Sequence, residues 1–362
     1  MKFSQFKDTN KLQNEVYESL IYLNKIIKTA SLNEKFYLIP KLNILIRKNT
    51  SVKLFLDVTK EYRKNKFFFT KYFSLIYILL TSILIKLRLA QLFFKTITIE
   101  CPDFYPIILG GNNRFRLIEA SNNHALVMAK TPKDIFFVKN AIRAKKEIPI
   151  SKDIDIPNLI PINERVYYEE QIDSIAINRL SLNENQKGFL ENSMNFFFNY
   201  QSIQSRTISI KSYLRYKLHV LNYYREINND DVINDLVDEF KETIQKIYKK
   251  QSLRKLNVCL SHGDLNRGNV FINNEKLHII DWEFFMYRFS KYDYYIYTKN
   301  LRHIDFDAYL KSLRGILSED LDGIIFLLEE LNFRILNYKD DVPHSKIFIN
   351  QILEIIKQNI NG

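Results

Sequence analysis

Three residues whose side-chain oxygens could bind a metal or accept a proton stand at informative spacing within one short stretch of the sequence, residues 260–283. Asp264 and Asn269 are separated by the spacing D-x-x-x-x-N, and Asp281 follows twelve residues after the asparagine. Two short apolar runs between Asn269 and Asp281 flank a pair of polar residues, which predicts a tight hairpin. Such a hairpin would return Asp281 close to Asn269. An amide and a carboxylate oxygen brought together in this way suit Mg²⁺, which keeps phosphate oxygens as its other ligands.

Asp264 lies on the loop ahead of this predicted hairpin. From that position its carboxylate would orient an acceptor hydroxyl and take its proton, which is the division of roles found in kinases. His262 is a second candidate because it adjoins Asp264, although a structural hydrogen bond suits it better than acid–base work. The pattern therefore predicts Asp264 and His262 as catalytic residues, with Asn269 and Asp281 as metal ligands.

The residues around this constellation resemble those of the aminoglycoside phosphotransferase and choline kinase superfamily. In that family the arginine of the kinase catalytic loop is typically a small residue, as is Gly263 in the H-G-D of residues 262–264. The family's metal aspartate commonly stands in an I-D-W/F-E context, as in residues 280–283. The family's downstream aspartate corresponds to Asp293. The resemblance extends over residues 103 to about 350, and it implies a protein-kinase-like fold with ATP and Mg²⁺ as cofactors.

The nucleotide-binding half carries weaker signals. Gly110 and Gly111 lie between two strand-like runs, where a kinase phosphate-covering loop would be. They lack the G-x-G-x-x-G spacing and fit an ordinary hairpin turn almost as well. Lys130 ends the strand-like residues 125–129. The resemblance makes Lys130 the candidate for the α- and β-phosphates of ATP, whereas a lone lysine at a strand end is as often simply solvated.

Two further features of the nucleotide site are implied by the resemblance alone. The glutamate that pairs with the lysine should lie on the helix predicted at residues 133–148. Glu147 is the acid available there, but the family places this glutamate nearer the helix middle, so the partner of Lys130 stays open. Backbone groups near Glu170 to Ile172, at the end of a strand-like segment, would contact the adenine base.

Positive charge is concentrated at the start of the 362-residue chain. Residues 1–100 hold 18 Lys and Arg against 7 Asp and Glu, a net of +11, whereas the whole chain has a net charge of +12. Nearly all of the basic excess therefore lies in the first hundred residues, which predicts affinity for an anionic surface. No nucleic-acid-binding signature accompanies this excess, so nucleic acid is not an expected partner.

The basic region contains a candidate for membrane contact. Residues 73–85 form an apolar run of thirteen without a charge, and Lys64, Lys66 and Lys71 precede it while Lys86 follows it. A membrane-spanning helix needs about 20 apolar residues, so this run is too short to span a bilayer. A buried core helix and a helix lying on a membrane surface both remain open.

The order of the remaining patterns indicates an α+β protein. Apolar residues recur at helical spacing over residues 12–27, and short strand-like runs separated by turn residues occupy residues 105–129. These short runs predict an antiparallel meander. Mostly helical patterns follow residue 187, interrupted by a β-rich island at residues 258–281.

Together with the resemblance, this order predicts a two-lobed protein-kinase-like fold. Residues 101–172 would form a small nucleotide-binding lobe and residues 173–362 a large helical catalytic lobe, with the active site between them. Residues 1–100 are expected to form a basic, mostly helical N-terminal extension. Cys101 and Cys259 lie far apart and form neither a zinc nor a disulfide pattern.

The expected function is ATP- and Mg²⁺-dependent phosphoryl transfer to a hydroxyl of a small molecule or glycan. No D-F-G or A-P-E motif follows Asp281, so nothing resembles an activation segment for a peptide substrate. The aromatic residues of 284–300 suit either a quaternary amine or a sugar face. The basic region favours an anionic or membrane-borne acceptor, such as a sugar of a cell-surface polysaccharide or lipid-linked glycan. A choline-, ethanolamine- or aminoglycoside-type kinase is the alternative enzyme. An inactive kinase-fold module that binds a membrane or a partner is the alternative from another class.

The expected location is the cytoplasm. The first twenty residues carry scattered charges where a signal peptide has an apolar core, and two cysteines are compatible with a reducing compartment. Peripheral contact with the inner face of an anionic membrane would be made through residues 1–100.

Overall fold

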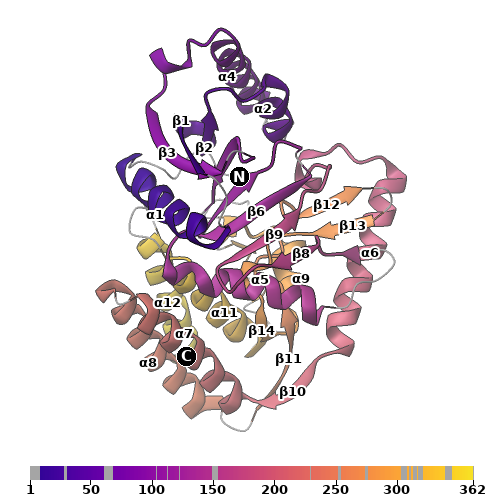
Figure 1. Ribbon diagram of the computed structural model, residues 1–362. Coiled ribbons are helices and arrows are strands. Elements are labelled where there is room, and N and C mark those ends of the chain that lie inside the picture. The colour runs from indigo at the N-terminus through magenta and orange to yellow at the C-terminus, as the bar shows by residue number, and fades with distance from the viewer. Residues whose placement is uncertain are drawn as a thin grey trace. The chain divides into compact units, whose positions relative to one another are not determined.

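The computed structural model divides the chain into two compact units (Figure 1). Unit 1 comprises Met1–Leu190 and Gly268–Ile280, and unit 2 comprises Glu191–Arg267 and Asp281–Gly362. The chain therefore passes from one unit to the other three times. The residues that the structure describes are 9–27, 31–60, 68–102, 104–111, 113–121, 123–148, 154–228, 230–251, 254–273, 276–302, 308–309, 311–312, 316, 321–338 and 345–361.

An eight-stranded sheet forms the centre of unit 1, in the order β3-β1-β2-β4-β5-β6-β9-β8. Its strands are β1 (Ser31–Ile39), β2 (Ile44–Arg47), β3 (Thr96–Pro102), β4 (Ile107–Gly110), β5 (Arg114–Ile118), β6 (His124–Ala129), β8 (Leu159–Pro161) and β9 (Val166–Glu170). Every neighbouring pair in this sheet is antiparallel. The consecutive strands β4, β5 and β6 confirm the predicted meander.

Different helices cover the two faces of this sheet. Along β6, Leu126 and Met128 lie in a core that includes helix α1 (Thr9–Ile27). Val127 and Ala129 lie in a second core with helix α5 (Ile135–Glu147). Successive side chains of a strand point to opposite faces, so α1 and α5 lie on opposite sides of β6.

Two more helices cover the α5 face of the sheet nearer its other edge. Helices α2 (Val52–Val58) and α4 (Phe68–Lys86) pack on β2, β4 and the first apolar residue of β6, Ala125. The Ser51 hydroxyl caps α2 by accepting the Leu54 N–H at 3.2 Å. Unit 1 also contains the short 3-10 helices η1 (Pro40–Leu42), η2 (Ala90–Leu92), η3 (Pro132–Asp134) and η4 (Ile177–Arg179).

The structure differs from the domain limits expected for the N-terminal hundred residues. Strands β1 and β2 lie within this region, and the expected limit at residue 100 falls inside β3, so the segment, although mostly helical as expected, also contributes strands to the sheet. Strand β2 pairs with β4, with Ile46 opposite Ile107. The added strands hydrogen-bond to an edge of β4 that would otherwise be open, which joins the N-terminal region to the nucleotide lobe in one sheet.

A second, three-stranded sheet completes unit 1. It contains β7 (Ile154–Asp155), β12 (Val270–Asn273) and β13 (Lys276–Ile279), in the order β12-β13-β7. Val270 pairs with Ile279 and Asn273 with Lys276, which confirms the predicted hairpin. The two turn residues, 274 and 275, lie outside the described residues.

Unit 2 consists of helices around a small sheet of β10 (Arg206–Ser209), β11 (Lys255–Ser261) and β14 (Met286–Phe289). Its helices are the C-terminal part of α6 (Glu184–Ile203), α7 (Ile210–Asn228), α8 (Asp231–Gln251), the 3-10 helix η5 (Trp282–Phe284), α9 (Tyr292–Thr298), α11 (Leu321–Leu336) and α12 (Ser345–Asn361). A sheet unit followed by a helical unit confirms the predicted α+β, kinase-like fold, with helix α1 at its N-terminal end.

The apolar run at residues 73–85 lies within α4 and has one buried face and one exposed face. Ile78 and Ile85 are buried in the core of unit 1, whereas Phe73, Leu80 and Ile83 are exposed. Within the described part of the chain, none of the helices combines the length and the apolar character that crossing a membrane requires.

Asn332 of α11 gives a first testable prediction about stability. Its side chain is 0% exposed, and among the described residues neither of its amide atoms has a hydrogen-bond partner. A buried polar group without a partner costs about 1–3 kcal/mol, so Asn332→Leu, which keeps the branched shape of the side chain, should raise the free energy of unfolding of unit 2 by up to that amount.

Urea unfolding followed by tryptophan fluorescence measures this change, because Trp282 is the only tryptophan of the chain and is buried in unit 2. Asn332→Asp is the matched opposite change: it keeps the shape but buries a charge, and should lower the free energy of unfolding. A leucine variant less stable than the wild type would show that the amide is satisfied in solution.

Candidate active site

The predicted catalytic loop follows β11, and its second residue occupies a position that only glycine can take. Gly263 has a φ of +84°, in the left-handed region. A Cβ there would lie 2.5 Å from the Phe284 carbonyl oxygen and 2.8 Å from the Phe284 Cβ. Both constraints exclude a side chain. The small residue of the H-G-D motif is therefore required by the local packing.

Asp293, on α9, fixes the backbone of this loop. Its carboxylate accepts the His262 N–H at 2.8 Å and the Gly263 N–H at 3.1 Å. The Gln201 side chain donates a third hydrogen bond to it at 2.8 Å. The downstream aspartate implied by the resemblance thus lies against the H-G-D motif, where it sets the path of the loop towards Asp264.

Asp264 itself is held by a cation. Arg302 Nε donates to Asp264 Oδ1 at 2.8 Å, and Asn266 Nδ2 donates to Asp264 Oδ2 at a longer 3.3 Å. The Asp264 N–H donates to His262 Nδ1 at 3.1 Å. His262 is completely buried, with its ring 4.6 Å from that of Trp282. This environment makes His262 a group that positions the Asp264 backbone, in line with the structural role expected for it.

Arg302 connects Asp264 to a buried carboxylate that sequence reasoning missed. Its guanidinium forms two hydrogen bonds to Glu330 of α11, at 2.6 and 2.8 Å. The hydroxyls of Tyr292 and Tyr309 also donate to Glu330, at 2.5 and 2.9 Å. Burial alone would raise the pKa of Glu330, but the charge and hydrogen bonds of Arg302 outweigh it and lower the pKa to about 2. Glu330 is therefore charged and holds Arg302 in place.

A second buried carboxylate lies next to the first. Glu329 accepts hydrogen bonds from Lys217 at 2.7 Å, from Arg288 at 2.6 Å and from the hydroxyl of Tyr213. Its pKa is lowered because these two cations outweigh the effect of burial. The signal was present in the sequence, since two adjacent acids interrupt the apolar run of α11. No spacing rule, however, connects them to Arg302 or Asp264.

The predicted metal ligands lie at the two ends of the β12–β13 hairpin. The Ile280 N–H donates to the Asn269 carbonyl oxygen at 3.0 Å, which closes the hairpin next to Asp281. Asp281 has a φ of +73°, a conformation that costs a non-glycine residue about 1 kcal/mol or more and is often retained at functional sites. One carboxylate and one amide are a donor set that fits Mg²⁺. Among the described residues, no group of three or more His, Cys, Asp or Glu has the arrangement of a metal site.

The structure brings the glycine loop and Lys130 together in unit 1. The Lys130 N–H donates to the carbonyl oxygen of Asn113, the residue before β5, at 3.2 Å. The amides of Gly110 and Gly111 donate to the carbonyl oxygens of Asn43 and Arg114, at 2.8 and 2.9 Å. The first of these bonds extends the pairing of β4 with β2, and the second closes the turn between β4 and β5. A phosphate-covering role for the two glycines remains a prediction.

Lys130 pairs with a residue that the sequence did not indicate. Its side chain is 5% exposed, and its Nζ lies 3.1 Å from Glu15 Oε2 of helix α1. Glu147 instead forms an ion pair with Arg143 one turn earlier on α5, at 2.6 Å. Glu147 is therefore not the partner of Lys130. The physical reason is that Lys130 packs on the α1 face of the sheet, near Phe115, whereas α5 covers the other face.

The ion pair between Glu15 and Lys130 predicts how α1 is attached. Removing one partner leaves a buried charge, and hydrogen bonds to charged groups contribute about 1.5–3 kcal/mol, so Glu15→Gln should raise amide exchange in Thr9–Ile27 more than tenfold. Glu18→Gln, an exposed acid on the same helix, is the control and should change exchange little. Equal exchange in both variants would mean that the apolar contacts of α1 alone hold it.

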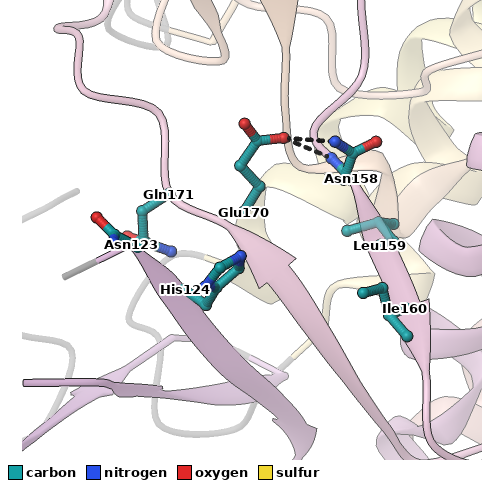
Figure 2. A pocket seen from close by; sticks show the side chains of 7 residues that line it. All are labelled: Asn123, His124, Asn158, Leu159, Ile160, Glu170 and Gln171. Carbon is teal, nitrogen blue, oxygen red and sulfur yellow. Dashed lines mark hydrogen bonds between the residues drawn. The ribbon is translucent and has the colours of Figure 1, made fainter. Parts of the chain in front are cut away.

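An open pocket of about 680 Å³ lies beside the predicted hinge, at the ends of β6, β8 and β9 (Figure 2). Its lining residues are Asn123, His124, Asn158, Leu159, Ile160, Glu170 and Gln171. The Glu170 carboxylate accepts the backbone N–H and the side-chain amide of Asn158, at 3.2 and 2.9 Å. The N–H groups of Glu170 and Gln171 already donate to carbonyl oxygens of the sheet. A donor to an adenine base in this segment would therefore come from Ile172 onward.

Comparison with known families identifies the region that carries the catalytic loop. Residues 183–323 match the model of the phosphotransferase enzyme family (APH). This range includes the H-G-D motif and Asp281, Asp293 and Arg302. The resemblance predicted from the motifs is confirmed there. A search among curated proteins finds no match to this chain.

Similar solved structures are those of small-molecule kinases. ADP-bound aminoglycoside phosphotransferase APH(2'')-Ib is 16% identical, with 70% of this chain and 92% of that chain covered and a TM-score of 0.42. The streptomycin–ATP ternary complex of APH(2'')-IIa is 14% identical, with 68% and 89% covered and a TM-score of 0.42. A choline/ethanolamine kinase family protein from Mesorhizobium loti is 11% identical, with 70% and 87% covered and a TM-score of 0.34.

Proposed function

We propose that this protein transfers the γ-phosphoryl group of ATP to a hydroxyl group of a small molecule, with Mg²⁺ as cofactor. The observation that carries the proposal is the catalytic loop of unit 2, in which Asp293 holds the backbone and Arg302 holds the Asp264 carboxylate. This loop lies within the residues that match the phosphotransferase family. Phosphoryl transfer needs positioning and charge neutralisation more than a strong base, and such a rigid, preorganised loop suits that need.

Each residue of the proposed site has a defined part in the reaction. Asp264 accepts the proton of the acceptor hydroxyl through Oδ2, because Oδ1 already accepts a charged hydrogen bond from Arg302. Asn269 and Asp281 would hold Mg²⁺, which when bound neutralises charge on the transferred phosphate. Lys130 is the candidate cation for the other phosphates, and Glu15 would hold its ammonium group in place.

An exposed arginine on the loop favours an uncharged or anionic acceptor over a cationic one. The Arg302 side chain is buried and shared between Asp264 and Glu330. Arg267, in contrast, is exposed and lies over the ring of Tyr297, 5.6 Å from its centre. A polycation or a quaternary amine at the loop would meet the charge of Arg267, whereas a sugar hydroxyl would not be repelled by it. Tyr294, Tyr297 and Phe198 form an aromatic cluster that could stack on a sugar face. A sugar is therefore the acceptor class that we propose.

A test of this function examines the two proposed metal ligands. Asp281→Ala should abolish the tightening of ATP binding by Mg²⁺, because it removes the only formal charge among the proposed ligands. Asn269→Ala should weaken the same tightening less. Isothermal titration with ATP, with and without Mg²⁺, measures both effects.

The matched control is Asp173→Ala, because the Asp173 side chain is 91% exposed and pairs with Lys60 at the surface of unit 1. It should behave as the wild type does. If ATP binds both ligand variants with an unchanged response to Mg²⁺, the proposed metal site is wrong. Turnover of ATP with a panel of sugars, choline and aminoglycosides then tests the acceptor class.

A further inference from the structure

The outward face of helix α4 is apolar, although it lies at the surface of unit 1. Its exposed side chains are Tyr72, Phe73, Ile76, Leu79, Leu80 and Ile83, which we call the α4 stripe. Phe73 is 72% exposed and Leu80 is 55% exposed, so these residues are not core residues with a small accessible edge. They recur at three- and four-residue spacing and therefore form one continuous face of the helix.

The opposite face of α4 buries the helix's small polar residues. Ser74, Thr81 and Ser82 are all buried, and the Ser82 hydroxyl donates to the Ile78 carbonyl oxygen at 2.7 Å. A surface helix of a globular protein normally does the reverse and turns its polar face to water. Contiguous exposed apolar side chains mark a surface that binds something other than water.

The segment of chain that carries the α4 stripe has only positive charges. Residues 63–99 contain seven Lys and Arg and no Asp or Glu. Three of the seven, Lys86, Arg88 and Lys95, are exposed just beyond the C-terminal end of the stripe. Leu92 and Phe93 lie between them in the sequence and are 70% and 67% exposed. Exposed basic and apolar side chains therefore alternate in the segment that follows the stripe.

From these observations we propose that the α4 stripe binds the surface of an anionic phospholipid bilayer. The apolar side chains would enter the boundary between headgroups and acyl chains, and Lys86, Arg88 and Lys95 would contact lipid phosphates. The helix would lie in the plane of the membrane, because no helix among the described residues is long and apolar enough to cross one. The proposal concerns attachment and does not depend on phosphotransferase activity.

A second copy of the chain fits this surface less well than a bilayer does. A symmetric contact through the α4 stripe would bring the basic residues of 63–99 against the same residues of the partner, with no acid in that segment to neutralise them. Like charges placed across an interface are unfavourable, whereas anionic headgroups supply the missing negative charge and the acyl chains supply the apolar surface.

The test is co-sedimentation of the full chain with two kinds of vesicle, phosphatidylcholine alone and phosphatidylcholine with phosphatidylglycerol. We expect binding to the anionic vesicles at about 0.01 M salt and its loss at about 1 M, where the screening length falls from about 30 Å to about 3 Å. Each basic residue near an anionic surface contributes about fivefold, so the combined variant Lys86→Gln, Arg88→Gln and Lys95→Gln should bind about a hundredfold more weakly.

Two further variants separate the stripe from its charges. Leu80→Gln with Ile83→Gln removes apolar side chains that are already in water, so folding should be retained and vesicle binding should fall at least tenfold. The charge control is Lys241→Gln, Lys246→Gln and Lys249→Gln, three exposed lysines of α8 in unit 2, which removes the same charge elsewhere. Its binding should equal that of the wild type. Circular dichroism and thermal melting check that each variant is folded.

Three results would overturn the proposal. Absence of binding to anionic vesicles is the first. The second is unchanged binding when Leu80 and Ile83 are replaced, because the attraction would then be general electrostatic adsorption. The third is sedimentation as a dimer that the same replacement dissociates, with no vesicle binding, which would assign the α4 stripe to a second copy of the chain.

Discussion

Replacement of Asp264 by asparagine is expected to lower ATP-dependent turnover by about 10²–10⁴-fold, the contribution typical of a general base. The asparagine keeps the shape of the side chain and a carbonyl oxygen that can still accept from Arg302, whose other hydrogen bonds to Glu330 remain. ATP binding should therefore stay near that of the wild type. Steady-state turnover and a separate nucleotide titration distinguish the two effects.

Asp238→Asn is the matched control for this substitution. Asp238 pairs with Arg225 on the surface of unit 2, and its side chain is 64% exposed, so its loss should leave turnover unchanged. Turnover of the Asp264 variant within a few-fold of wild type would remove Asp264 from the mechanism. A parallel loss of ATP affinity would point instead to damage to the loop.

Replacement of Glu330 by glutamine is expected to lower the free energy of unfolding of unit 2 by about 3–5 kcal/mol. Arg302 has a side chain that is only 8% exposed, and it would lose the carboxylate with which it forms two hydrogen bonds. Arg302 would keep only its ion pair with Asp264, and a buried charge that loses its main partner is far more costly than a broken surface pair. Urea unfolding followed by Trp282 fluorescence measures the change. Glu242→Gln, an exposed acid of α8, should have little effect.

The same carboxylate should make unit 2 sensitive to acid. Burial alone would raise the pKa of Glu330 above its ordinary value of 4.5. The charge and hydrogen bonds of Arg302 have the larger effect and lower the pKa to about 2. A carboxyl group whose folded pKa is depressed stabilises the fold above its unfolded pKa and loses that contribution as the pH falls through its folded pKa. We expect this group to account for about 3 kcal/mol of lost stability between about pH 5 and pH 2. The Glu330→Gln variant should lack this part of the loss, and an unchanged acid profile would show that Glu330 is not charged.

Local backbone constraints explain which parts of the site could be predicted. Gly263 has a positive φ and no room for a Cβ, and Asn269 and Asp281 stand at the two ends of one hairpin. Such features depend on residues that are close in the sequence, so they can be predicted from the spacing of a motif. The loop and the hairpin were accessible for this reason, whereas Asp293, thirty-one residues after His262, was identified only from the family resemblance.

Contacts between distant segments explain most of what could not be predicted. Glu15 and Lys130 are 115 residues apart, and Arg302 lies 38 residues after Asp264. Nothing in the spacing of either pair indicates that they meet. Glu147 was considered for Lys130 because it lies on the adjoining helix, but the side of the sheet on which a strand-end residue packs is decided by tertiary contacts.

Strand assignment in the first hundred residues failed for a related reason. Strand β1 (Ser31–Ile39) mixes polar and apolar residues in a short run, and such runs do not distinguish strand from helix. Its partner β3 (Thr96–Pro102) begins more than fifty residues later. Because pairing of this kind depends on the rest of the sheet, the apolar residues between β1 and β3 favoured a mostly helical interpretation without these strands.

The interleaving of the two units along the chain has a consequence for synthesis on the ribosome. The large sheet of unit 1 is encoded before Leu190, but the β12–β13 hairpin that completes this unit is encoded after Glu191–Arg267 of unit 2. At about 5–20 residues per second, on the order of ten seconds separates the two. During that interval the strand β7, which later pairs with β13, has no neighbour. A nascent chain stalled before residue 268 would thus carry the folded large sheet together with an unpaired β7 segment, whose free backbone groups are a site where chaperones or other nascent chains can bind.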